Sequence, residues 1–590
     1  MCRPAAKKLR MLRLTEVTLP LDHPPEAIAA AVRERLGVTP EDVRAVHVFR
    51  RSWDARKKSA ITLTYTLDVE VRNEAAVLAA VQKRAQAAGK GAPKAAAKAT
   101  IGPMPDVSYH FPFALPSAGC EAAAPARIGA RDAGGARPRP VVIGAGPCGL
   151  FAALILAQMG LRPIILERGK VVRERTKDTW GLWRRSVLNP GSNVQFGEGG
   201  AGTFSDGKLY SGIKDHHRRD RKVLTEFVKA GAPDEILFVA KPHIGTFRLV
   251  TMVESMRATI EGLGGEYRFG TQMIDLLVDT DAAGNRHVRG LKLDTGDELA
   301  ATHVVLALGH IARDTFQMLY DRGVYVEAKP FSVGVRIEHP QSLIDRARFG
   351  DNAGNKILGA ADYKLVHHAK NGRSAYSFCM CPGGTVVAAA SEPDGVVTNG
   401  MSQYSRAERN ANAGLVVGIT PEVDYPGHPL AGIEFQRRWE RLAFKAGGEN
   451  FRAPAQRVGD FLAGRPSTKL GSVIPSYRPG VTPTDLAQCL PDFAVAAMRE
   501  ALPMFERQIK GYAMDDAVMT GVETRTSSPV RIKRDASFQS LNTKGLFPAG
   551  EGAGYAGGIL SAGVDGIRVA EAVATAIARS LGLDVPPLRD

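Results

Sequence analysis

The sequence predicts an α/β protein built on a Rossmann-like dinucleotide-binding unit, and three features of residues 139–169 carry this prediction. The run at 141–143 is apolar and β-branched, which is typical of a buried strand. Glycines follow it in the spacing G-x-G-x-x-G, and an apolar helical pattern then extends to Gly160. A second apolar segment at 163–166 ends on Glu167, at the distance from the glycines where such units place a ribose-binding acid.

Each glycine of this turn has a separate expected role. Gly144 permits the tight turn out of the strand, Gly146 lets the backbone approach a pyrophosphate, and Gly149 lets the helix pack closely on the sheet. The phosphates then lie at the helix N-terminus, opposite free N–H groups and the positive end of the helix dipole. The alternative is a glycine turn in another kind of α/β protein, with Glu167 as an ordinary surface residue.

Pattern and composition divide the 590-residue chain into several segments. The order βαββαβ over the first part, with its last strand near Val107, predicts a small ferredoxin-like α+β domain. The nucleotide-binding domain is expected to be split in sequence, with a substrate or cap domain inserted between its halves. The expected boundaries are an extension at 1–10, the ferredoxin-like domain at 11–112, a linker at 113–139, the first part of the nucleotide-binding domain at 140–329, the inserted domain at 330–510, and the second part of the nucleotide-binding domain at 511–582.

The net charge of +16 is unevenly distributed, since residues 1–140 hold 23 of the 77 basic but only 13 of the 61 acidic residues. A basic N-terminal quarter suits an anionic partner such as RNA, and it also suits general solubility alone. One basic cluster lies between two expected strands, where an anion or partner site and a solvated hairpin loop are the alternatives. Its members are Arg50, Arg51, Arg56, Lys57 and Lys58, with Asp54 among them.

Composition argues against several broad classes of protein. Hydrophobic residues make up 44% of the chain, enough for a large core, yet no apolar run reaches the length of a membrane span. The basic N-terminus lacks the apolar region of a secretory signal. Six cysteines are too few for a disulfide scaffold, and no Cys/His grouping has zinc-ligand spacing. We therefore expect a cytoplasmic protein without a metal site.

Later segments are expected to reach the same ligand as the first turn. Residues 193–212 contain six glycines, which suits backbone lying against a flat ligand or phosphates, although a plain surface loop is the alternative. The buried strand in THVVLALGH ends at the ligand crevice of a doubly wound sheet. A final strand, glycine-rich turn and long helix begin near residue 545, with Glu551 directly after the strand. Within residues 193–212, Ser205, Asp206 and Lys208 are expected to make polar contacts with the ligand.

Together these segments resemble the two-dinucleotide-binding-fold flavoproteins, through the GAGPCG turn with Glu167, the VVLALG strand and the segment GLFPAGEGAGYAGGI. More closely, the chain resembles the bacterial family of FAD-dependent, or NAD(FAD)-utilizing, dehydrogenases of unknown substrate. The motifs, which span almost the whole chain from Met11, are SWDARKK, FGEGGAGTFSDGKL, PHIGT, GHIARDTF, SFCMCPGG, NGMSQYSRAERNAN, GVETRTSSPVRI and GEGAGYAGGI. Two positions depart from the family pattern: Ile311 replaces a polar residue and Phe247 replaces an acid.

The resemblance implies bound FAD, with its phosphates at the first turn and its ribityl chain near Glu551. Many such proteins carry Asp at this last position, so Glu551 is a longer substitute. Backbone N–H groups of residues 197–208 and of the Gly557–Gly558 pair are then expected near the flavin ring. The predicted cofactor-binding residues are Gly144, Gly146, Pro147, Gly149, Glu167, Arg168, Gly199, Gly200, Thr203, Gly309, Gly550, Glu551, Gly552, Gly557, Gly558 and Ile559.

Three residues are weak candidates for catalysis. His310 and Arg313 follow the late strand and are expected to point toward the crevice, with a purely structural His310 as the alternative. Arg525 is expected either to neutralise an anion or to pair with Glu523.

Cysteines form a further motif. Cys379 and Cys381 lie on one expected strand with Tyr376, and alternation places both thiols on the same face. Such a pair is either redox active or, as is commoner, buried in a strand. Cys148 fills a small-residue position in the first turn.

The function expected from these features is an FAD-dependent oxidoreductase, a dehydrogenase or reductase, that acts on a small molecule by hydride transfer through the flavin. The alternative is a flavoprotein that binds or modifies RNA through the basic N-terminal domain. A third alternative is flavin binding without catalysis. Because no second strand–GxGxxG–helix unit follows residue 149, NAD(P)H is expected to act, if at all, as a transient reductant without its own domain.

Overall fold

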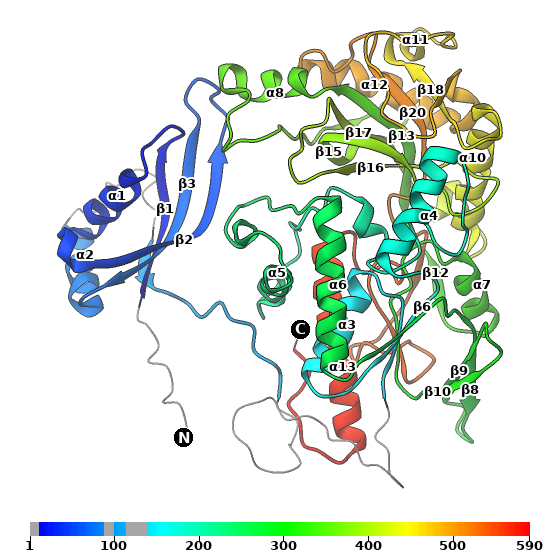
Figure 1. Cartoon of the computed structure of the whole chain (residues 1–590), viewed down its shortest axis with the longest axis horizontal. Coiled ribbons are helices and arrows are strands. Elements are labelled where there is room, and N and C mark those ends of the chain that lie inside the picture. The colour runs from blue at the N-terminus through cyan, green and yellow to red at the C-terminus, as the bar shows by residue number, and fades with distance from the viewer. Residues whose placement is uncertain (1–10, 88–99, 114–138, 590) are drawn as a thin grey trace.

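The computed structural model describes residues 11–87, 100–113 and 139–589, and Figure 1 shows three parts: a small N-terminal domain, a nucleotide-binding domain and a β-rich inserted domain. The expected extension at 1–10 and nearly all of the expected linker at 113–139 lie outside the described residues. Across the ranges that are described, no helix combines the length and the apolarity needed to cross a bilayer.

The N-terminal domain follows the expected order of elements, and its antiparallel sheet has the strand order β2-β3-β1-β4. Alternating apolar side chains of β1 and β3 face the two helices, so the core lies between the sheet and the helical layer. The expected strand near Val107 is wrong: the last strand ends at Pro103. The elements are β1 (Met11–Pro20), α1 (Glu26–Leu36), β2 (Val43–Asp54), β3 (Thr62–Val71), α2 (Glu74–Ala87) and β4 (Ile101–Pro103).

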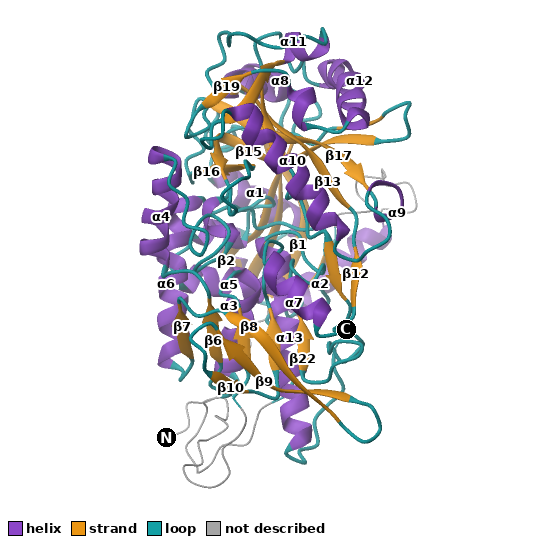
Figure 2. Cartoon of the chain, turned by 90° about the vertical axis from the view of Figure 1, so that its right-hand side faces the viewer, coloured by secondary structure: helices purple, strands orange, loops and turns teal. Residues whose placement is uncertain are grey.

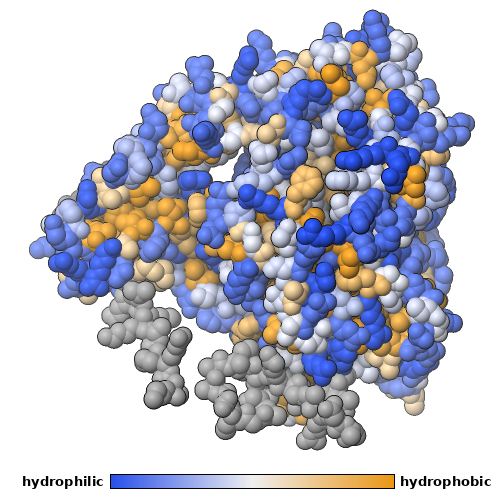
Figure 3. Space-filling model, in the orientation of Figure 1, coloured by the Kyte–Doolittle hydropathy of each residue, from blue (hydrophilic) through white to orange (hydrophobic). Residues whose placement is uncertain are grey.

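The hairpin between β2 and β3 docks onto the rest of the chain. Arg51 exchanges backbone hydrogen bonds with residues 238–240, at 2.6 and 2.9 Å. The Trp53 ring packs edge-on against Phe349 of the inserted domain, with 5.4 Å between ring centroids. The prediction of a solvated loop is therefore confirmed only for the hairpin tip at 56–60, which is exposed. Figure 3 shows an opening between the N-terminal domain and the other two parts beside this contact.

Past β4, the chain already lies on the nucleotide-binding domain. The hydroxyl of Tyr109 donates to Glu571 Oε1 of the C-terminal helix at 2.9 Å. The ammonium group of Lys222 lies over the rings of both Tyr109 and Phe111. The segment at 107–113 is thus attached to the nucleotide-binding domain, whereas the expected boundary at residue 112 assigned most of it to the N-terminal domain.

The nucleotide-binding domain is built on a parallel five-stranded sheet with the order β22-β11-β5-β6-β7. Strands β5 and β6 with the helix between them form the βαβ unit that the glycine spacing predicts. The last strand and last helix come from the C-terminal end of the chain, so the domain is split in sequence. Its elements are β5 (Val141–Ile143), α3 (Pro147–Gln158), β6 (Ile164–Glu167), α4 (Val172–Arg185), α5 (Arg219–Lys229), α6 (Thr246–Gly262), β7 (Glu266–Phe269), β8 (Met273–Thr280), β9 (Arg286–Leu293), β10 (Glu298–Ala300), β11 (Val304–Leu306), α7 (Arg313–Asp321), β22 (Leu546–Pro548) and α13 (Ile559–Ser580).

Both faces of this sheet are covered, which explains why β5, β11 and β22 are apolar at every position, whereas the edge strand β7 carries Glu266 and Arg268. Val142 and Val305 point into a core shared with α3, α6 and α13. Val141 and Leu306 point the other way, into a core shared with the three-stranded sheet β8–β10 and with α7. The strands are only three or four residues long, so they place their carboxyl ends, rather than a broad surface, at the edge where a ligand binds.

The inserted domain contains an eight-stranded, mainly antiparallel sheet, and Figure 2 shows the two large sheets stacked along the length of the molecule. Strand β20 pairs with β13 and β18, so the expected boundary at 510/511 falls before the end of this sheet and the insertion extends past residue 523. A separate ribbon, β12 (Val326–Ala328) with β21 (Val530–Ile532), connects the two domains. The elements are β13 (Phe331–Pro340), α8 (Gln341–Phe349), β14 (Val366–His368), β15 (Ser374–Ala388), β16 (Thr398–Ser402), β17 (Asn410–Ile419), α9 (Pro421–Asp424), α10 (Ala431–Gly447), β18 (Ala453–Arg457), α11 (Val458–Leu462), β19 (Val481–Pro483), α12 (Asp492–Gln508) and β20 (Val518–Glu523).

Candidate active site

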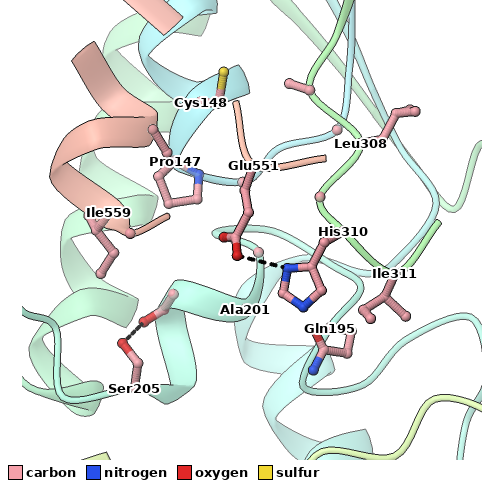
Figure 4. A pocket seen from close by; sticks show the side chains of 18 of the residues that line it. Pro147, Cys148, Gln195, Ala201, Ser205, Leu308, His310, Ile311, Glu551 and Ile559 are labelled. Carbon is pink, nitrogen blue, oxygen red and sulfur yellow. Dashed lines mark hydrogen bonds and ion pairs between the residues drawn. The ribbon is translucent and has the colours of Figure 1, made fainter. Parts of the chain in front are cut away.

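A cavity of about 430 Å³ lies at the carboxyl ends of β5, β6 and β11 and extends to β15 and β20 of the inserted domain. Its volume falls within the range of small-molecule and cofactor sites. We call the part formed by 143–147, 166–168 and 271–273 the nucleotide end. The part formed by Lys208 together with residues of β15 and β20 is the inserted-domain end. Figure 4 shows the central region between them, where the first turn, the last turn and the 195–205 loop meet.

The first turn contains two glycines that the fold requires and one that it does not. A Cβ atom on Gly149 would lie 1.9 Å from the carbonyl oxygen of Gly144, and one on Gly144 would lie 2.4 Å from that of Ala307. Gly144 also has a φ of +99°, which disfavours any other residue. At Gly146, by contrast, φ is −73° and a Cβ would meet no atom closer than 3.7 Å. Gly146 therefore carries no side chain at a position that lines the cavity, although the surrounding protein leaves room for one.

Two helices, α3 and α13, begin at this cavity, and each has a glycine as its N-cap residue. Gly146 is the N-cap of α3 and Gly558 the N-cap of α13, and neither N-terminus has a side-chain cap. A Cβ on Gly557 or Gly558 would meet nothing within 4 Å, so this second turn is also clear of side chains. Two uncapped, positively polarised helix ends on one cavity match a ligand that carries phosphate charge.

Glu167 has a different role from the one expected. Its carboxylate accepts backbone hydrogen bonds from Ala145 at 2.9 Å, from Gly169 at 2.9 Å and from Gly197 at 3.0 Å. It thereby ties the first turn to the glycine-rich loop while one edge of the residue still lines the cavity. Glu167 thus lines the cavity, as a ribose-binding residue would have to, and its contact with a nucleotide remains a prediction.

Arg168 lies beside Glu167 and also lines the cavity. Its guanidinium makes a two-pronged ion pair with Asp314, with both distances 3.0 Å, and lies 4.4 Å from the centre of the Phe196 ring. These contacts fix Arg168 between α7 and the 195–205 loop. Residues 271–273, which follow β7, complete this wall. They were not predicted as site residues, although they follow the carboxyl end of a parallel strand, where ligands bind in such sheets.

His310 and Glu551 lie side by side in the middle of the cavity, where they form an ion pair when His310 is protonated (Figure 4). The distance from His310 Nδ1 to Glu551 Oε1 is 3.1 Å. The other ring nitrogen, Nε2, is buried and has no hydrogen-bond partner among the residues that the structure describes. A buried polar atom that the protein leaves without a partner is costly, so Nε2 is suited to meet a polar group of a bound ligand. Glu551, expected to contact the cofactor, orients this ring.

Arg313 and Arg525 belong to a buried ion cluster around Glu440. Arg525 donates to the two Glu440 oxygens at 3.0 and 2.8 Å, and Arg313 donates to them at 2.8 and 3.1 Å. The expected pairing of Arg525 with Glu523 is therefore wrong, although Arg525 does line the cavity. Arg313 does not line it: its guanidinium also binds Glu392 and Gln436, away from the crevice to which the sequence assigned it.

Charge balance holds this cluster in its ionised form. Burial opposes ionisation of Glu440, but the charges of Arg313 and Arg525 more than offset it and hold the pKa of Glu440 well below its usual value. Thr524 adds a hydroxyl hydrogen bond at 2.8 Å to the same carboxylate. The cluster joins α7, α10 and the end of β20, so it fixes the inserted domain against the nucleotide-binding domain.

The structure brings together most of the predicted cofactor residues. Those that line the cavity are Gly144, Gly146, Pro147, Glu167, Arg168, Gly200, Gly309, Glu551, Gly557, Gly558 and Ile559. The predicted residues outside its lining are Gly149, Gly199, Thr203, Gly550 and Gly552. The latter act through packing: a Cβ on Gly552 would lie 2.4 Å from the Gly309 carbonyl oxygen, and one on Gly550 would lie 2.8 Å from Cys148 Cβ.

The two family departures have different surroundings. Ile311 is buried and lines the cavity, so an apolar side chain occupies a wall position there. Phe247 lies on α6 with 53% of its surface exposed, outside the cavity lining. Residues that the sequence reading missed include Gln195, Asn399, Glu523 and Ser561, which line the cavity from four separate segments. Their approach depends on tertiary packing, which no local pattern records.

Comparison with known families agrees with this division of the chain. Residues 330–526 match the family model described as the FAD-dependent protein C-terminal domain, which ends within a few residues of β20. Residues 11–70 match a domain of unknown function, DUF8436, within the N-terminal domain. The family boundary at 526 therefore supports the correction that the sheet topology makes to the expected boundary at 510.

Similar proteins are found both by sequence and by structure. An uncharacterized protein of Clostridium beijerinckii (strain ATCC 51743 / NCIMB 8052) is 44% identical over 562 residues, covering 95% of this chain and 98% of the relative. A geranylgeranyl bacteriochlorophyll reductase-like protein of Thermoplasma acidophilum has a TM-score of 0.34 at 12% identity, covering 75% of this chain and 79% of that one. A probable FAD-dependent monooxygenase of Pseudomonas aeruginosa, PqsL, has a TM-score of 0.32 at 13% identity, covering 75% and 87%. The chain therefore belongs to the same family as the Clostridium beijerinckii protein, and its residues 330–526 resemble the C-terminal domain of FAD-dependent proteins.

Proposed function

We propose that the protein is an FAD-dependent oxidoreductase of the dehydrogenase or reductase type, and that its small-molecule substrate binds in the cavity beside the flavin. The observation that carries this proposal is Gly146, which the fold leaves bare on the cavity wall without any steric need of its own. The match of residues 330–526 to an FAD-dependent domain supports it independently.

The residues present fit FAD as the cofactor. Gly146 and Pro147 at the start of α3, with Gly557 and Gly558 at the start of α13, would hold the phosphates by backbone N–H groups and helix dipoles. Glu167 and Arg168 would border the adenosine at the nucleotide end. The lining residues of the 200–208 loop and of the inserted domain would then border the flavin ring. When bound there, FAD supplies two-electron redox chemistry.

His310 is the group best placed to handle a proton in this site. Glu551 holds Nδ1, so Nε2 keeps a fixed direction and is free to donate to, or accept from, a polar group of the ligand. We propose that this nitrogen orients the bound cofactor or substrate and transfers a proton during turnover. The buried cluster around Glu440 keeps Arg525 in place, so one cationic wall faces the same space.

For the reductant, we propose that NADH or NADPH visits the flavin transiently. Support comes from the inserted domain, whose sheet is mainly antiparallel in the described residues and offers no second strand–glycine turn–helix unit there. We also propose a cytoplasmic location, and a ferredoxin-like fold for the N-terminal domain, which its order of strands supports.

The alternative of RNA binding or modification gains no support. The two family models that match do not describe a nucleic-acid-binding domain. Part of the basic hairpin that motivated this alternative is engaged within the chain itself, through Arg51 and Trp53.

Purification and cofactor analysis test the proposed function. We expect yellow protein that releases one FAD per chain on acid precipitation, identified by chromatography. Anaerobically, we expect dithionite to bleach the flavin band fully, whereas NADH or NADPH alone bleaches it slowly. A colourless protein that takes up no added FAD contradicts the proposal, and fast saturable reduction by NAD(P)H with tight binding contradicts the transient reductant.

A further inference from the structure

The C-x-C motif lies at an irregular point of β15, not on a regular strand. Pairing with β17 is regular as far as Phe378 and resumes at Cys381, with a register shift between them. Cys379 has a φ of +40°, a left-handed conformation that is rare for a residue other than glycine. Bulges of this kind redirect a side chain and occur often beside active sites. Here the side chain of Cys379 is accessible and lines the cavity, whereas Cys381 is fully buried. The prediction that both thiols share a face through simple alternation therefore does not describe this strand.

A buried arginine holds the irregular segment. The guanidinium of Arg336, on β13, donates to the Cys379 carbonyl oxygen at 3.1 and 3.2 Å and lies 3.6 Å from Cys381 Sγ. Its Nε is 3.4 Å from Glu523 Oε2. Arg336 has no exposed surface, and Gly400 provides its space, since a Cβ there would lie 1.7 Å from Arg336 Nη2. The chain thus maintains a positive charge directly behind the two cysteines.

A second positive charge comes from the glycine-rich loop. Lys208 Nζ donates to the carbonyl oxygen of Met380, the residue between the two cysteines. Asp206 Oδ2 lies 3.6 Å from this ammonium group, but Asp206 is already paired with Arg406. The cysteines therefore lie in an electropositive pocket, which is the environment of reactive thiols.

This environment separates the two thiols in acidity. The neighbouring Cys381 side chain, together with the charges of Lys208 and Arg336, lowers the pKa of Cys379 below its usual value. The neighbouring Cys379 side chain, together with burial, raises the pKa of Cys381. Because Cys379 is accessible and lines the cavity, it is the thiol that a substrate can reach. Cys381, fully buried two residues away, is then the resolving thiol.

We propose that Cys379 and Cys381 are a redox-active dithiol at the flavin end of the cavity, and that the substrate is a low-molecular-mass disulfide. The geometry that carries this is an accessible Cys379 on a strained bulge, a second thiol two residues away, and two cations beside them. Cys379 and Lys208 line the cavity, and Cys381 and Arg336 lie buried behind them. The proposal rests on the proposed flavin function for the source of its electrons.

The chemistry balances in two steps. Cys379 thiolate attacks one sulfur of the substrate disulfide, the substrate S–S bond breaks, and the first thiol leaves with a proton. Cys381 then loses its proton and attacks Cys379 Sγ, which releases the second thiol and forms the Cys379–Cys381 disulfide. Two electrons from the reduced flavin, with two protons, return this disulfide to the dithiol. NAD(P)H, the reductant of the proposed function, restores the flavin.

Mass spectrometry of the full chain tests the couple directly. Trypsin yields the peptide 374–406, which contains both cysteines and no other. The protein is treated with bis(2-hydroxyethyl) disulfide, blocked with iodoacetamide and digested. We expect the wild-type peptide to lose two hydrogens and to resist alkylation at both sulfurs. Cys381→Ser is expected to stop at the mixed disulfide on Cys379, and Cys379→Ser to remain unmodified. The buried Cys489→Ser is the matched control and should behave as wild type.

A flavin readout tests the relay. In the anaerobic protein with its flavin reduced by light, the same disulfide should restore the flavin absorption band in the wild type and in Cys489→Ser, but not in either variant of the motif. Equal recovery in all four proteins, or a wild-type peptide that retains the mixed disulfide, would overturn the proposal. If the chain carries no FAD, the peptide assay still reports disulfide closure, so failure of the flavin function and failure of the thiol couple are separate outcomes.

Discussion

The nucleotide end and the inserted-domain end of the cavity are built by different means. At the nucleotide end, much of the wall is backbone without side chains, as at Gly144 and Gly146. Toward the inserted-domain end, charged side chains line the cavity and pair with buried charges behind them, as Arg525 does with Glu440 and Glu523 with Arg336. The first end suits a phosphate-bearing group, whereas under the proposed function the second end would contact the substrate. Substitutions should therefore affect the two ends in different ways.

The largest effect is expected at the inserted-domain end, from Glu440→Gln. Removing this charge leaves Arg313 and Arg525 buried without their counter-ion, which typically costs about 3–5 kcal/mol in the free energy of unfolding. Urea unfolding followed by circular dichroism measures it. Glu434→Gln, on the same helix with 66% of its side chain exposed, is the control and should change stability by less than about 1 kcal/mol. Equal effects for the two variants would mean that the cluster does not hold the domains together.

A pH effect is expected from His339 on β13, close to Arg336. Burial lowers the pKa of His339 to about 4, although its Nε2–H group donates to the Tyr512 carbonyl oxygen at 2.7 Å. Between an unfolded pKa of about 6.5 and this folded value, only the unfolded chain binds the proton, so stability falls as pH falls through this window, by about 3 kcal/mol in all.

The variant His339→Gln, which keeps a donor, should flatten this acid limb in urea unfolding at pH 7 and pH 5. The exposed His368→Gln on β14 is the control. An acid limb that is as steep in His339→Gln as in the wild type would exclude His339 as its source.

A smaller effect is expected at the nucleotide end, from Glu167→Gln. The amide group cannot accept all three backbone N–H bonds that the carboxylate accepts from Ala145, Gly169 and Gly197. We expect a loss of about 1.5–3 kcal/mol in the free energy of unfolding, together with weaker FAD retention, because the first turn loses its tie to the glycine-rich loop. Thermal unfolding with and without added FAD measures both. Glu174→Gln, at an exposed position, is the control and should match the wild type. If Glu167→Gln leaves both stability and FAD retention unchanged, Glu167 does not hold the first turn to the glycine-rich loop.

The nucleotide end was largely predictable from sequence, because its features are local. A glycine spacing after an apolar strand predicts the turn and the helix, and Gly149 packs as that spacing requires. Features that depend on distant segments were not predictable. The partner of Arg525 is Glu440, 85 residues away, and the backbone conformation of Cys379 follows from contacts with Arg336 and Lys208. The end of the insertion was misplaced for the same reason, since the pairing of β20 with β13 joins segments almost 200 residues apart.

The FAD content of Gly146→Val tests the central claim most directly. The substitution places a branched side chain in the space assigned to the pyrophosphate, while the nearest protein atom to its Cβ would be 3.7 Å away, so the chain should fold. Gly262→Val is the matched control, because Gly262 also has open space around its Cβ but lies on α6 outside the cavity lining. With folding verified by circular dichroism, we predict one FAD per chain in the wild type and in Gly262→Val, and almost none in Gly146→Val. A folded Gly146→Val protein with the wild-type FAD content would contradict the account.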